Sequence, residues 1–414
     1  MVEIPRMKSG ENLKRIMDQN YLDGHVQAQA GKFVVWIAIG VPIELLRGFD
    51  IVIAVPENHA AMCAARAMGP LLAEKAESAG YSMDLCSYAR IDLGTVFARG
   101  KDSPSRGLPG PHLLISDNNH CSHLVKWFDV HHREMKIPHF ILDVPFCYEP
   151  QKAKDLNYII SQYQDLVSFI QDRTGQKFDI DKVREAIVHT REGITQWKRF
   201  LTFAAHRPSG ITAFDSFLHM APYITSYRGT QTLVEHYTQL ADEVEGRVAS
   251  GMFPVPNEKY RLFWDNIAPW HQLNRMSARL ADFQANIIYA YYTAVMGSLE
   301  GDIDMYPFDE ADSFVTLARI QNGTLCPYGL ELRVKAMSKA IERLGVDGIV
   351  FSSNRSCKPY SLMQLDIQKR LSSRFGIPSV MIDVDHADAR KYNEAQALMR
   401  IEALLEMIDG RRQC

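Results

Sequence analysis

Residues 112–128 read HLLISDNNHCSHLVKWF, and residues 348–367, far along the chain, read GIVFSSNRSCKPYSLMQLDI. Each stretch is a short apolar run, then a polar turn of the form Asn-x-x-Cys, then a segment with helical character. A strand that enters a helix through a tight polar turn places that turn at the carboxyl edge of a parallel sheet, where open α/β folds bind ligands. The repetition therefore predicts two similar α/β lobes, each with a cysteine at a ligand-binding edge.

Apolar runs of strand length continue on both sides of the two stretches. They lie at Phe33–Ile39, Ile51–Val55, His112–Ile115, Phe140–Val144, Arg261–Trp264, Ile287–Tyr292, Ile349–Phe351 and Val380–Val384. Near-continuous hydrophobic strands separated by helical stretches indicate parallel sheets that are covered on both faces. We expect an α/β protein with two parallel-sheet lobes of the flavodoxin-like or Rossmann-like type.

The middle of the chain carries a different pattern. From about Glu149 to Gly251 the strand signals stop, and long charged stretches have helical spacing. The last segment is an amphipathic helix whose apolar face consists of Leu398, Ile401, Leu405 and Ile408. We therefore predict an N-terminal α/β lobe over residues 1–148, a helical segment over 149–255 and a C-terminal α/β lobe over 256–414.

The composition is that of an ordinary soluble protein. The 414 residues are 46% hydrophobic and 23% charged, with a formal net charge of −3, so no electrostatic footprint for nucleic acid is present. The longest apolar run, Phe33 to Leu46, is interrupted by Gly40 and Pro42 and is too short for a bilayer. The first residues carry charges where a signal peptide needs an apolar core. We expect a cytoplasmic protein with no membrane or nucleic-acid partner.

Cysteines at turns form the main chemical signal. Seven cysteines are too few for a disulfide scaffold in a chain of this length, and a reducing compartment favours metal binding or catalysis. Cys86 lies in a third polar turn and joins Cys121 and Cys357. A thiolate near a helix N-terminus is favoured by the partial positive charge there. Three such thiolates are typical of a metal site with an open position, or of a cubane cluster with one exposed iron.

Simpler explanations stand beside this one. No CxxC pair occurs, and free cysteines are often small buried hydrophobes. Cys63 lies in an alanine-rich helical stretch and is expected in the core. Cys147, Cys326 and Cys414 are expected to be a packing residue, a loop thiol and part of an unstructured terminus.

Six segments resemble the 2-hydroxyacyl-CoA dehydratase family, which includes the ATP-dependent benzoyl-CoA reductases. They are VPENHAAMCAARAMG, GYSMDLCSYARIDLG, DNNHCSHLVKWFDV, IPHFILDVPF, NRSCKPYSLMQLD and DVDHADARKYNEAQALMRIEALLEM. The motifs span nearly the whole chain in the family's order, and PENHAA and CSYAR resemble the larger, substrate-binding subunit. In that family each subunit holds a 4Fe-4S cluster through three cysteines. By this resemblance Cys86, Cys121 and Cys357 are the cluster ligands.

The resemblance also implies a reaction and partners. A separate ATP-hydrolysing iron–sulfur activator injects one electron, and an acyl-CoA becomes a ketyl radical anion that eliminates water. A smaller homologous subunit completes a heterodimer. No Gly-x-x-x-x-Gly-Lys sequence occurs here, in agreement with ATP hydrolysis by another protein. The alternatives are a subunit of a benzoyl-CoA reductase, a non-catalytic iron–sulfur electron-transfer protein, and a two-lobed binding protein without metal.

Residues near the predicted sheet edge are candidates for acid–base chemistry and for substrate binding. Glu57 follows the second strand and is, by resemblance, the catalytic acid or base; the alternative is a helix N-terminal glutamate favoured by the dipole. Asn58 and His59 are weaker candidates for substrate contacts, since such residues more often cap or line a helix start. Arg355, beside Cys357, could bind CoA phosphates or form a structural salt bridge.

One position departs from the family pattern. Relatives that dehydrate 2-hydroxy acids often carry a small hydroxyl residue after the first strand, near the substrate thioester, and Ile39 stands at the corresponding position. An isoleucine side chain donates no hydrogen bond, so the substrate contact at this position must differ. We therefore expect a hydrophobic or aromatic acyl group, and reduction of an aromatic acyl-CoA becomes a rival to dehydration.

Overall fold

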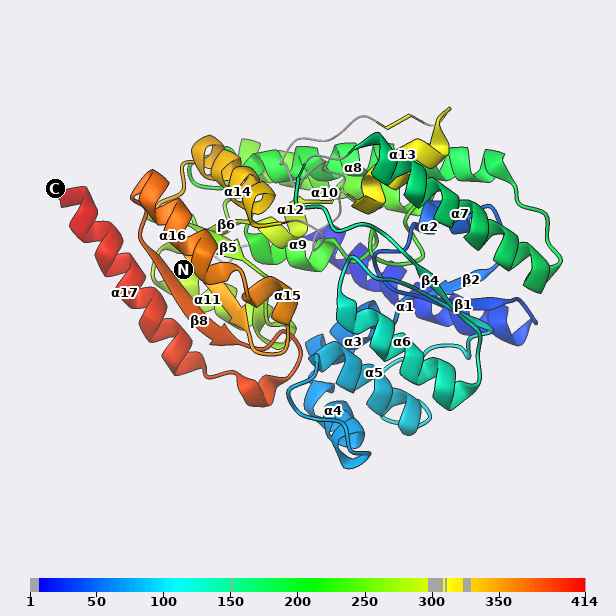
Figure 1. Ribbon diagram of the computed structural model, residues 1–414. Coiled ribbons are helices and arrows are strands. Elements are labelled where there is room, and N and C mark those ends of the chain that lie inside the picture. The colour runs from blue at the N-terminus through cyan, green and yellow to red at the C-terminus, as the bar shows by residue number, and fades with distance from the viewer. Residues whose placement is uncertain (1–6, 150–151, 297–307, 310, 323–328, 414) are drawn as a thin grey trace.

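A computed structural model describes residues 7–149, 152–296, 308–309, 311–322 and 329–413. Two four-stranded, all-parallel sheets occupy opposite halves of the molecule (Figure 1). The strands are β1 (Val34–Ile37), β2 (Val52–Ala54), β3 (Leu113–Asp117), β4 (His139–Leu142), β5 (Tyr260–Asp265), β6 (Ala285–Ala290), β7 (Gly348–Asn354) and β8 (Ser379–Val384). The predicted fold class, α/β with two parallel-sheet lobes, is confirmed.

The two sheets share one topology. Their strand orders are β2-β1-β3-β4 and β6-β5-β7-β8. The order reverses between β1 and β3 in the first sheet and between β5 and β7 in the second, and ligands bind at such switch points. The turns that carry Cys121 and Cys357 follow β3 and β7, the strands on one side of each switch point.

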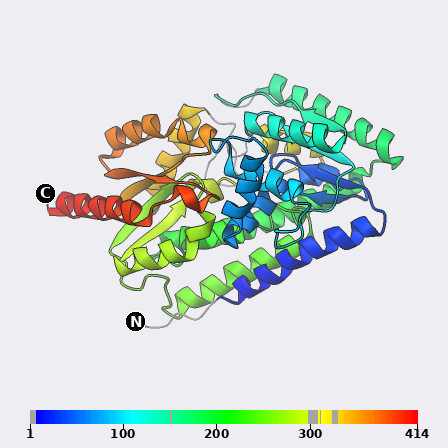
Figure 2. The same cartoon turned by 90° about the horizontal axis from the view of Figure 1, so that it is seen from below.

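The helical segment links the lobes. It contains α7 (Ala153–Thr174), α8 (Ile180–Thr202), α9 (Ala213–His219) and α10 (Gln231–Ala249), and no strand occurs in residues 152–251. The first helix, α1 (Lys8–Gln29), lies along α10 (Figure 2). The backbone N–H groups of Lys8 and Ser9 donate to the Glu243 carboxylate of α10, each at 2.8 Å. The division of the chain at 148/149 and 255/256 stays a prediction.

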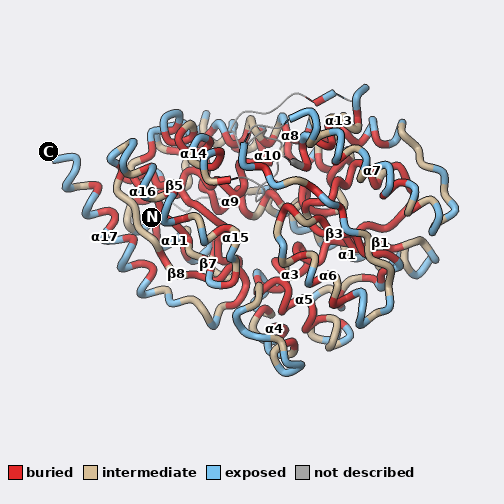
Figure 3. Tube along the Cα trace, in the orientation of Figure 1, coloured by how far each residue is buried: buried red, intermediate tan, exposed pale blue. Residues whose placement is uncertain are grey.

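Burial follows the hydrophobic pattern. The inner strands are buried along almost their whole length, whereas the edge strands β4 and β8 are partly exposed (Figure 3). The C-terminal helix α17 (Glu394–Gln413) packs on β8 and β7, and its four predicted apolar residues are all buried. Among the helices in the described part of the chain, none combines the length and the apolarity that a bilayer crossing requires.

Several strand ends differ from the sequence prediction, among them those of β6 and β1. β6 stops at Ala290 because Tyr291–Ala294 already form the short helix α12. β1 stops at Ile37, and Gly40 follows in the turn. A Cβ on Gly40 would lie 2.6 Å from a carboxylate oxygen of Asp117, so only glycine fits against this buried acid.

Candidate functional site

A cavity is lined by residues from both lobes and from the segment between them. Most of its wall is apolar or aromatic: Ile39, Ala61, Tyr88, Leu124, Trp127, Ile224, Ile267, Trp270, Tyr292 and Pro359. Its other lining residues are Glu57, Asn58, Cys86, His120, Cys121, His123, Cys357 and His386. A mainly apolar cleft with a few convergent polar groups is the usual form of a small-molecule site.

The structure brings Cys86, Cys121 and Cys357 to this one cavity, and each is the N-cap residue of a helix. The helices are α5 (Ser87–Phe97), α6 (Ser122–Met135) and the short α15 (Lys358–Ser361). Neither the Cys86 sulfur nor the Cys121 sulfur caps its helix through a side-chain hydrogen bond, but the backbone N–H groups at the start of α5 and α6 lower the pKa of the two thiols. Nearby N–H groups favour the negatively charged form of a sulfur.

The protonation of these thiols differs from the sequence expectation. Burial raises the pKa of Cys86, and the neighbouring Cys357 and Cys121 thiols raise it further. Burial also raises the pKa of Cys121. Loss of hydration therefore outweighs the helix N-termini, which were expected to favour thiolates. A positively charged group between the sulfurs would restore that preference.

The chemistry of the donor set fits an iron–sulfur cluster. Within the described ranges, no three His, Cys, Asp or Glu side chains are grouped as ligands of one ion. The thiolates of a cubane cluster bind different irons, so their sulfurs need not converge on one point. Three soft sulfur donors in a largely apolar cavity are the ligands that such clusters use.

Glu57 lies in the first turn of α3 (Pro56–Ala65), after β2. Its Oε1 accepts the Ile39 backbone N–H at 3.0 Å, and its buried Oε2 has no hydrogen-bond partner in the described part of the chain. Burial raises the pKa of Glu57 to about 8, although the hydrogen bond from Ile39 opposes the rise. The carboxyl group therefore holds a proton at neutral pH and can donate it into the cavity.

Of the other predicted substrate contacts, two line the cavity and two lie outside its wall. Ile39 and Asn58 line the cavity, and Asn58 Oδ1 accepts from the Tyr21 hydroxyl at 2.7 Å. His59 is fully buried away from it, with Nε2 2.8 Å from Ser103 Oγ, because the next residue of a helix points in another direction. Arg355 is 58% exposed and lies 3.6 Å from Asp383. His59 and Arg355 therefore do not line the cavity, and their roles as substrate contacts stay predictions.

The sequence analysis missed several cavity residues, and His386 is the main one. Its side chain is buried and follows β8, and its Nε2 lies 3.9 Å from Cys86 Sγ. The sequence signal for this residue was a histidine just beyond the carboxyl end of a predicted strand. It lies in a segment that was used only to identify the family resemblance. Trp270, whose indole donates to the Tyr88 hydroxyl, had no comparable pattern.

Of the other cysteines, Cys63 and Cys147 are buried outside the cavity. Cys63 Sγ lies 3.7 Å from His59 Nε2, and the Cys147 thiol donates to the Glu149 carbonyl at 3.4 Å. Cys326 and Cys414 lie outside the described residues.

Comparison with known proteins gives consistent matches. Residues 38–408 match the family described as 2-hydroxyglutaryl-CoA dehydratase, D-component. The chain is 30% identical to the (R)-phenyllactyl-CoA dehydratase alpha subunit of Clostridium sporogenes, over 99% of this chain and 98% of the relative. It is 29% identical to a benzoyl-CoA reductase subunit of Thauera aromatica, over 89% and 87%. It is 25% identical to the alpha subunit of the (R)-2-hydroxyglutaryl-CoA dehydratase of Acidaminococcus fermentans, over 96% of each chain.

Proposed function

The chain belongs to the 2-hydroxyglutaryl-CoA dehydratase D-component family, and on that premise we propose that it is the cluster-binding subunit of a 2-hydroxyacyl-CoA dehydratase. The observation that carries the proposal is the meeting of three N-cap cysteines from two lobes in one cavity. The relatives include a dehydratase subunit and a benzoyl-CoA reductase subunit, so both kinds of enzyme occur among the proteins that resemble this chain. The cluster, the radical reaction and the partners are our proposals.

Cys86, Cys121 and Cys357 would hold a 4Fe-4S cluster. When bound, the cluster supplies single-electron transfer, and its iron without a cysteine ligand supplies a Lewis acid. A four-iron cluster held by three cysteines would keep one iron without a cysteine ligand, and the two other described cysteines, Cys63 and Cys147, lie outside the cavity.

Glu57 would act as the general acid and then as the general base of the elimination. Its protonated carboxyl donates to the departing hydroxyl group, so that the Cα–O bond breaks and water forms. The resulting carboxylate then accepts a proton from Cβ and returns to its starting state. One electron enters the substrate before the C–O bond breaks and leaves afterwards, so the net reaction is loss of water without oxidation or reduction.

The cavity wall favours a bulky apolar acyl group. Trp127, Trp270 and Tyr292 supply aromatic surface, and Ile39 supplies an aliphatic side chain beside Glu57. A polar acyl group that entered this wall would leave buried polar atoms unpaired, at a cost of about 1–3 kcal/mol for each. We therefore propose a hydrophobic or aromatic 2-hydroxyacyl-CoA as substrate.

Two partners complete the proposal. The relatives are named as single subunits of larger enzymes, so we propose a smaller homologous subunit in a heterodimer. We also propose a separate ATP-hydrolysing iron–sulfur activator as electron donor, since the sequence has no Gly-x-x-x-x-Gly-Lys phosphate loop.

A second candidate function is reduction of an aromatic acyl-CoA. The observation in its favour is the same wall, which the aliphatic Ile39 and several aromatic side chains line. Dehydration gives an enoyl-CoA, whereas ring reduction gives a cyclic diene thioester, so product analysis separates the two.

The test is anaerobic isolation of the chain with its partner subunit, followed by iron, sulfide and electron paramagnetic resonance measurements. We expect a brown preparation with iron and sulfide in equal amounts, and an enoyl-CoA product once a reducing activator and ATP are supplied. A preparation that stays colourless after anaerobic reconstitution would indicate a binding protein without metal. A loaded enzyme whose spectrum no acyl-CoA changes would indicate a non-catalytic electron carrier.

A further inference from the structure

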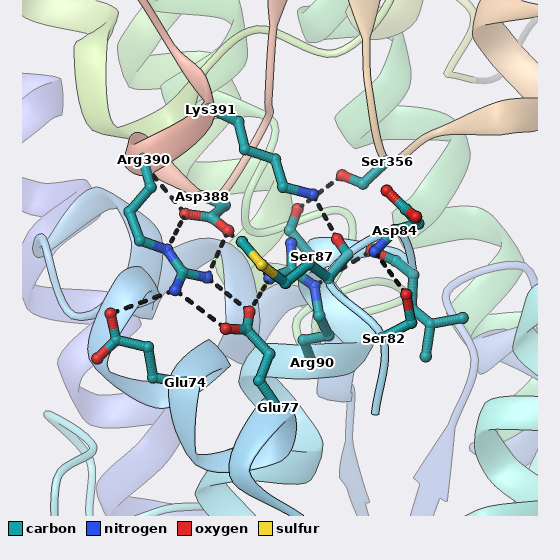
Figure 4. Close-up of polar contacts among 12 residues, drawn as sticks. Glu74, Glu77, Ser82, Asp84, Ser87, Arg90, Ser356, Asp388, Arg390 and Lys391 are labelled. Atoms are coloured by element: carbon teal, nitrogen blue, oxygen red, sulfur yellow. Dashed lines mark hydrogen bonds and ion pairs between the residues drawn. The ribbon is translucent and has the colours of Figure 1, made fainter. Parts of the chain in front are cut away.

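A buried polar bridge joins the two lobes beside the cavity (Figure 4). Ser87 directly follows Cys86, and Ser356 directly precedes Cys357. Their hydroxyl oxygens lie 3.2 Å apart, and both side chains are buried. The contact therefore connects the chain neighbours of two cavity cysteines, one from each lobe.

A single loop holds both hydroxyl groups. Residues 385–388, which follow β8, place Asp385 Oδ2 2.6 Å from Ser356 Oγ and His386 Nε2 3.0 Å from Ser87 Oγ. Asp385 Oδ1 accepts the backbone N–H groups of Ala387 and Asp388, at 3.0 and 2.8 Å, so the carboxylate is fixed within its own turn.

The histidine of this loop is also fixed. Asn354 Nδ2 donates to the Ile267 carbonyl at 2.7 Å, so Asn354 Oδ1 is the atom that lies 3.3 Å from His386 Nδ1. In the neutral imidazole this arrangement places the proton on Nδ1 and leaves Nε2 to accept from the Ser87 hydroxyl. The ring is thereby oriented by the C-terminal lobe and binds the N-terminal lobe.

The same loop is anchored to the N-terminal lobe at its far end. Arg90, on α5 four residues after Cys86, donates to Asp388 Oδ2 at 2.9 Å, and both side chains are fully buried. Arg390 pairs with Asp388 and also reaches Glu77 of α4 (Gly69–Ser78) (Figure 4). A Cβ on Gly69 would lie 2.3 Å from the Ala387 carbonyl oxygen, so the loop packs directly on the start of α4.

We propose that Ser87 and Ser356 are positioning residues that fix the separation of Cys86 and Cys357 before a cluster binds. The two cysteines belong to different lobes, and a ligand set shared by two lobes is preformed only if the separation of the ligands is held. The Ser356 hydroxyl shares its one proton between Asp385 Oδ2 and Ser87 Oγ. Buried polar networks of this kind provide rigidity because a shift leaves a polar group unsatisfied. That this separation serves cluster binding rests on the proposed function. The separation of the two cysteines can be measured without a cluster.

The test uses the iron-free full-length chain and dibromobimane, a short reagent that becomes fluorescent when it bridges two thiols. Peptide mapping identifies the Cys86–Cys357 bridge, and monobromobimane labelling checks that each thiol remains accessible. We expect Ser356→Ala to slow bridging about tenfold, the factor for one hydrogen bond to a buried charged group. Ser87→Ala should act in the same direction.

A double-mutant cycle isolates the contact between the hydroxyls. If the two serines act through one bridge, Ser87→Ala in the Ser356→Ala background should add little further loss. The matched control is Ser338→Ala, which removes another buried serine of the C-terminal lobe whose hydroxyl has no partner in the described part of the chain. This control should bridge at the parental rate.

Reconstituted protein gives a second readout. Ser356→Ala should broaden or shift the resonance spectrum of the reduced cluster, and Ser356→Thr, which keeps the hydroxyl, should restore it. Bridging at the parental rate in both Ser356→Ala and Ser87→Ala, or no Cys86–Cys357 bridge in the parent, would overturn the proposal. If bridging is slower in the variants but the chain never binds iron, the role of the polar bridge is supported and the cluster assignment is contradicted. Should Ser356→Ala not fold, the Ser87→Ala rate decides.

Discussion

Glu57 combines one firm hydrogen bond with a carboxyl oxygen that has no partner among the described residues. If this group moves protons during turnover, Glu57→Gln should retain the cluster and acyl-CoA binding. Its activity should fall by roughly a hundredfold or more, the scale of a positioned acid or base. The measurement is the rate of enoyl-CoA formation at saturating activator. A rate within a few-fold of the parent would make Glu57 a structural helix N-terminal residue.

The raised pKa of Glu57 also predicts how stability depends on pH. The folded chain holds this proton up to about pH 8, whereas the unfolded chain releases it near the ordinary glutamate value. The unfolded state therefore binds fewer protons between these values, and the free energy of unfolding should fall as pH rises through this window. Chemical denaturation of iron-free Glu57→Gln across the same window should show a flatter dependence. Identical slopes in parent and variant would contradict the burial of an ionisable Glu57.

A substitution at Ile39 tests whether the apolar cavity wall contacts the substrate. Its backbone N–H holds Glu57 and survives any side-chain change, so Ile39→Ser alters the wall without removing that hydrogen bond. A new donor should improve binding of a 2-hydroxyacyl-CoA relative to its deoxy analogue by about 1–3 kcal/mol. The matched pair is titrated anaerobically against parent and variant. An unchanged ratio of the two affinities would place Ile39 outside the substrate contact and remove the reason to doubt dehydration of small polar substrates.

At the scale of elements, the lobes are held together by buried charge. Arg90 of α5 pairs with Asp388 after β8, and both side chains are fully buried. Arg90→Met removes one partner of this pair and should lower the free energy of unfolding by about 3 kcal/mol or more. The control is Arg133→Met, which breaks the exposed pair with Asp129 on α6 and should cost less than about 1 kcal/mol. Equal losses in urea unfolding would show that the Arg90 pair adds nothing beyond a surface pair.

The elements themselves were largely predictable. All eight strands fall where apolar runs occur, because a parallel strand covered on both faces needs a near-continuous hydrophobic sequence. The end of β6 was not predictable from the same pattern. Tyr291 and Tyr292 suit a strand by propensity, yet they begin α12, and tertiary packing decides between such alternatives.

At the scale of the whole molecule, the cysteines form a set only because two lobes meet. Changing Cys86, Cys121 or Cys357 to alanine should each remove most of the bound iron, since a three-thiolate shell has no spare ligand. Iron per chain after anaerobic reconstitution is the measurement. Cys63→Ala is the control, because Cys63 is fully buried outside the cavity. Full iron retention in the Cys357 variant would end the assignment.

The sequence by itself determined the two-lobed α/β fold and the turns that carry Cys121 and Cys357, because strand periodicity and turn chemistry are local properties of the chain. It also indicated Glu57 and Ile39, which follow two neighbouring strands. Only the tertiary structure decided that Cys86, which follows a helix, reaches the same cavity. It alone directed His59 and Arg355 elsewhere, brought His386 to Cys86, and raised the thiol pKa values. These outcomes depend on which residues distant in sequence pack together and exclude water, and no local pattern encodes that.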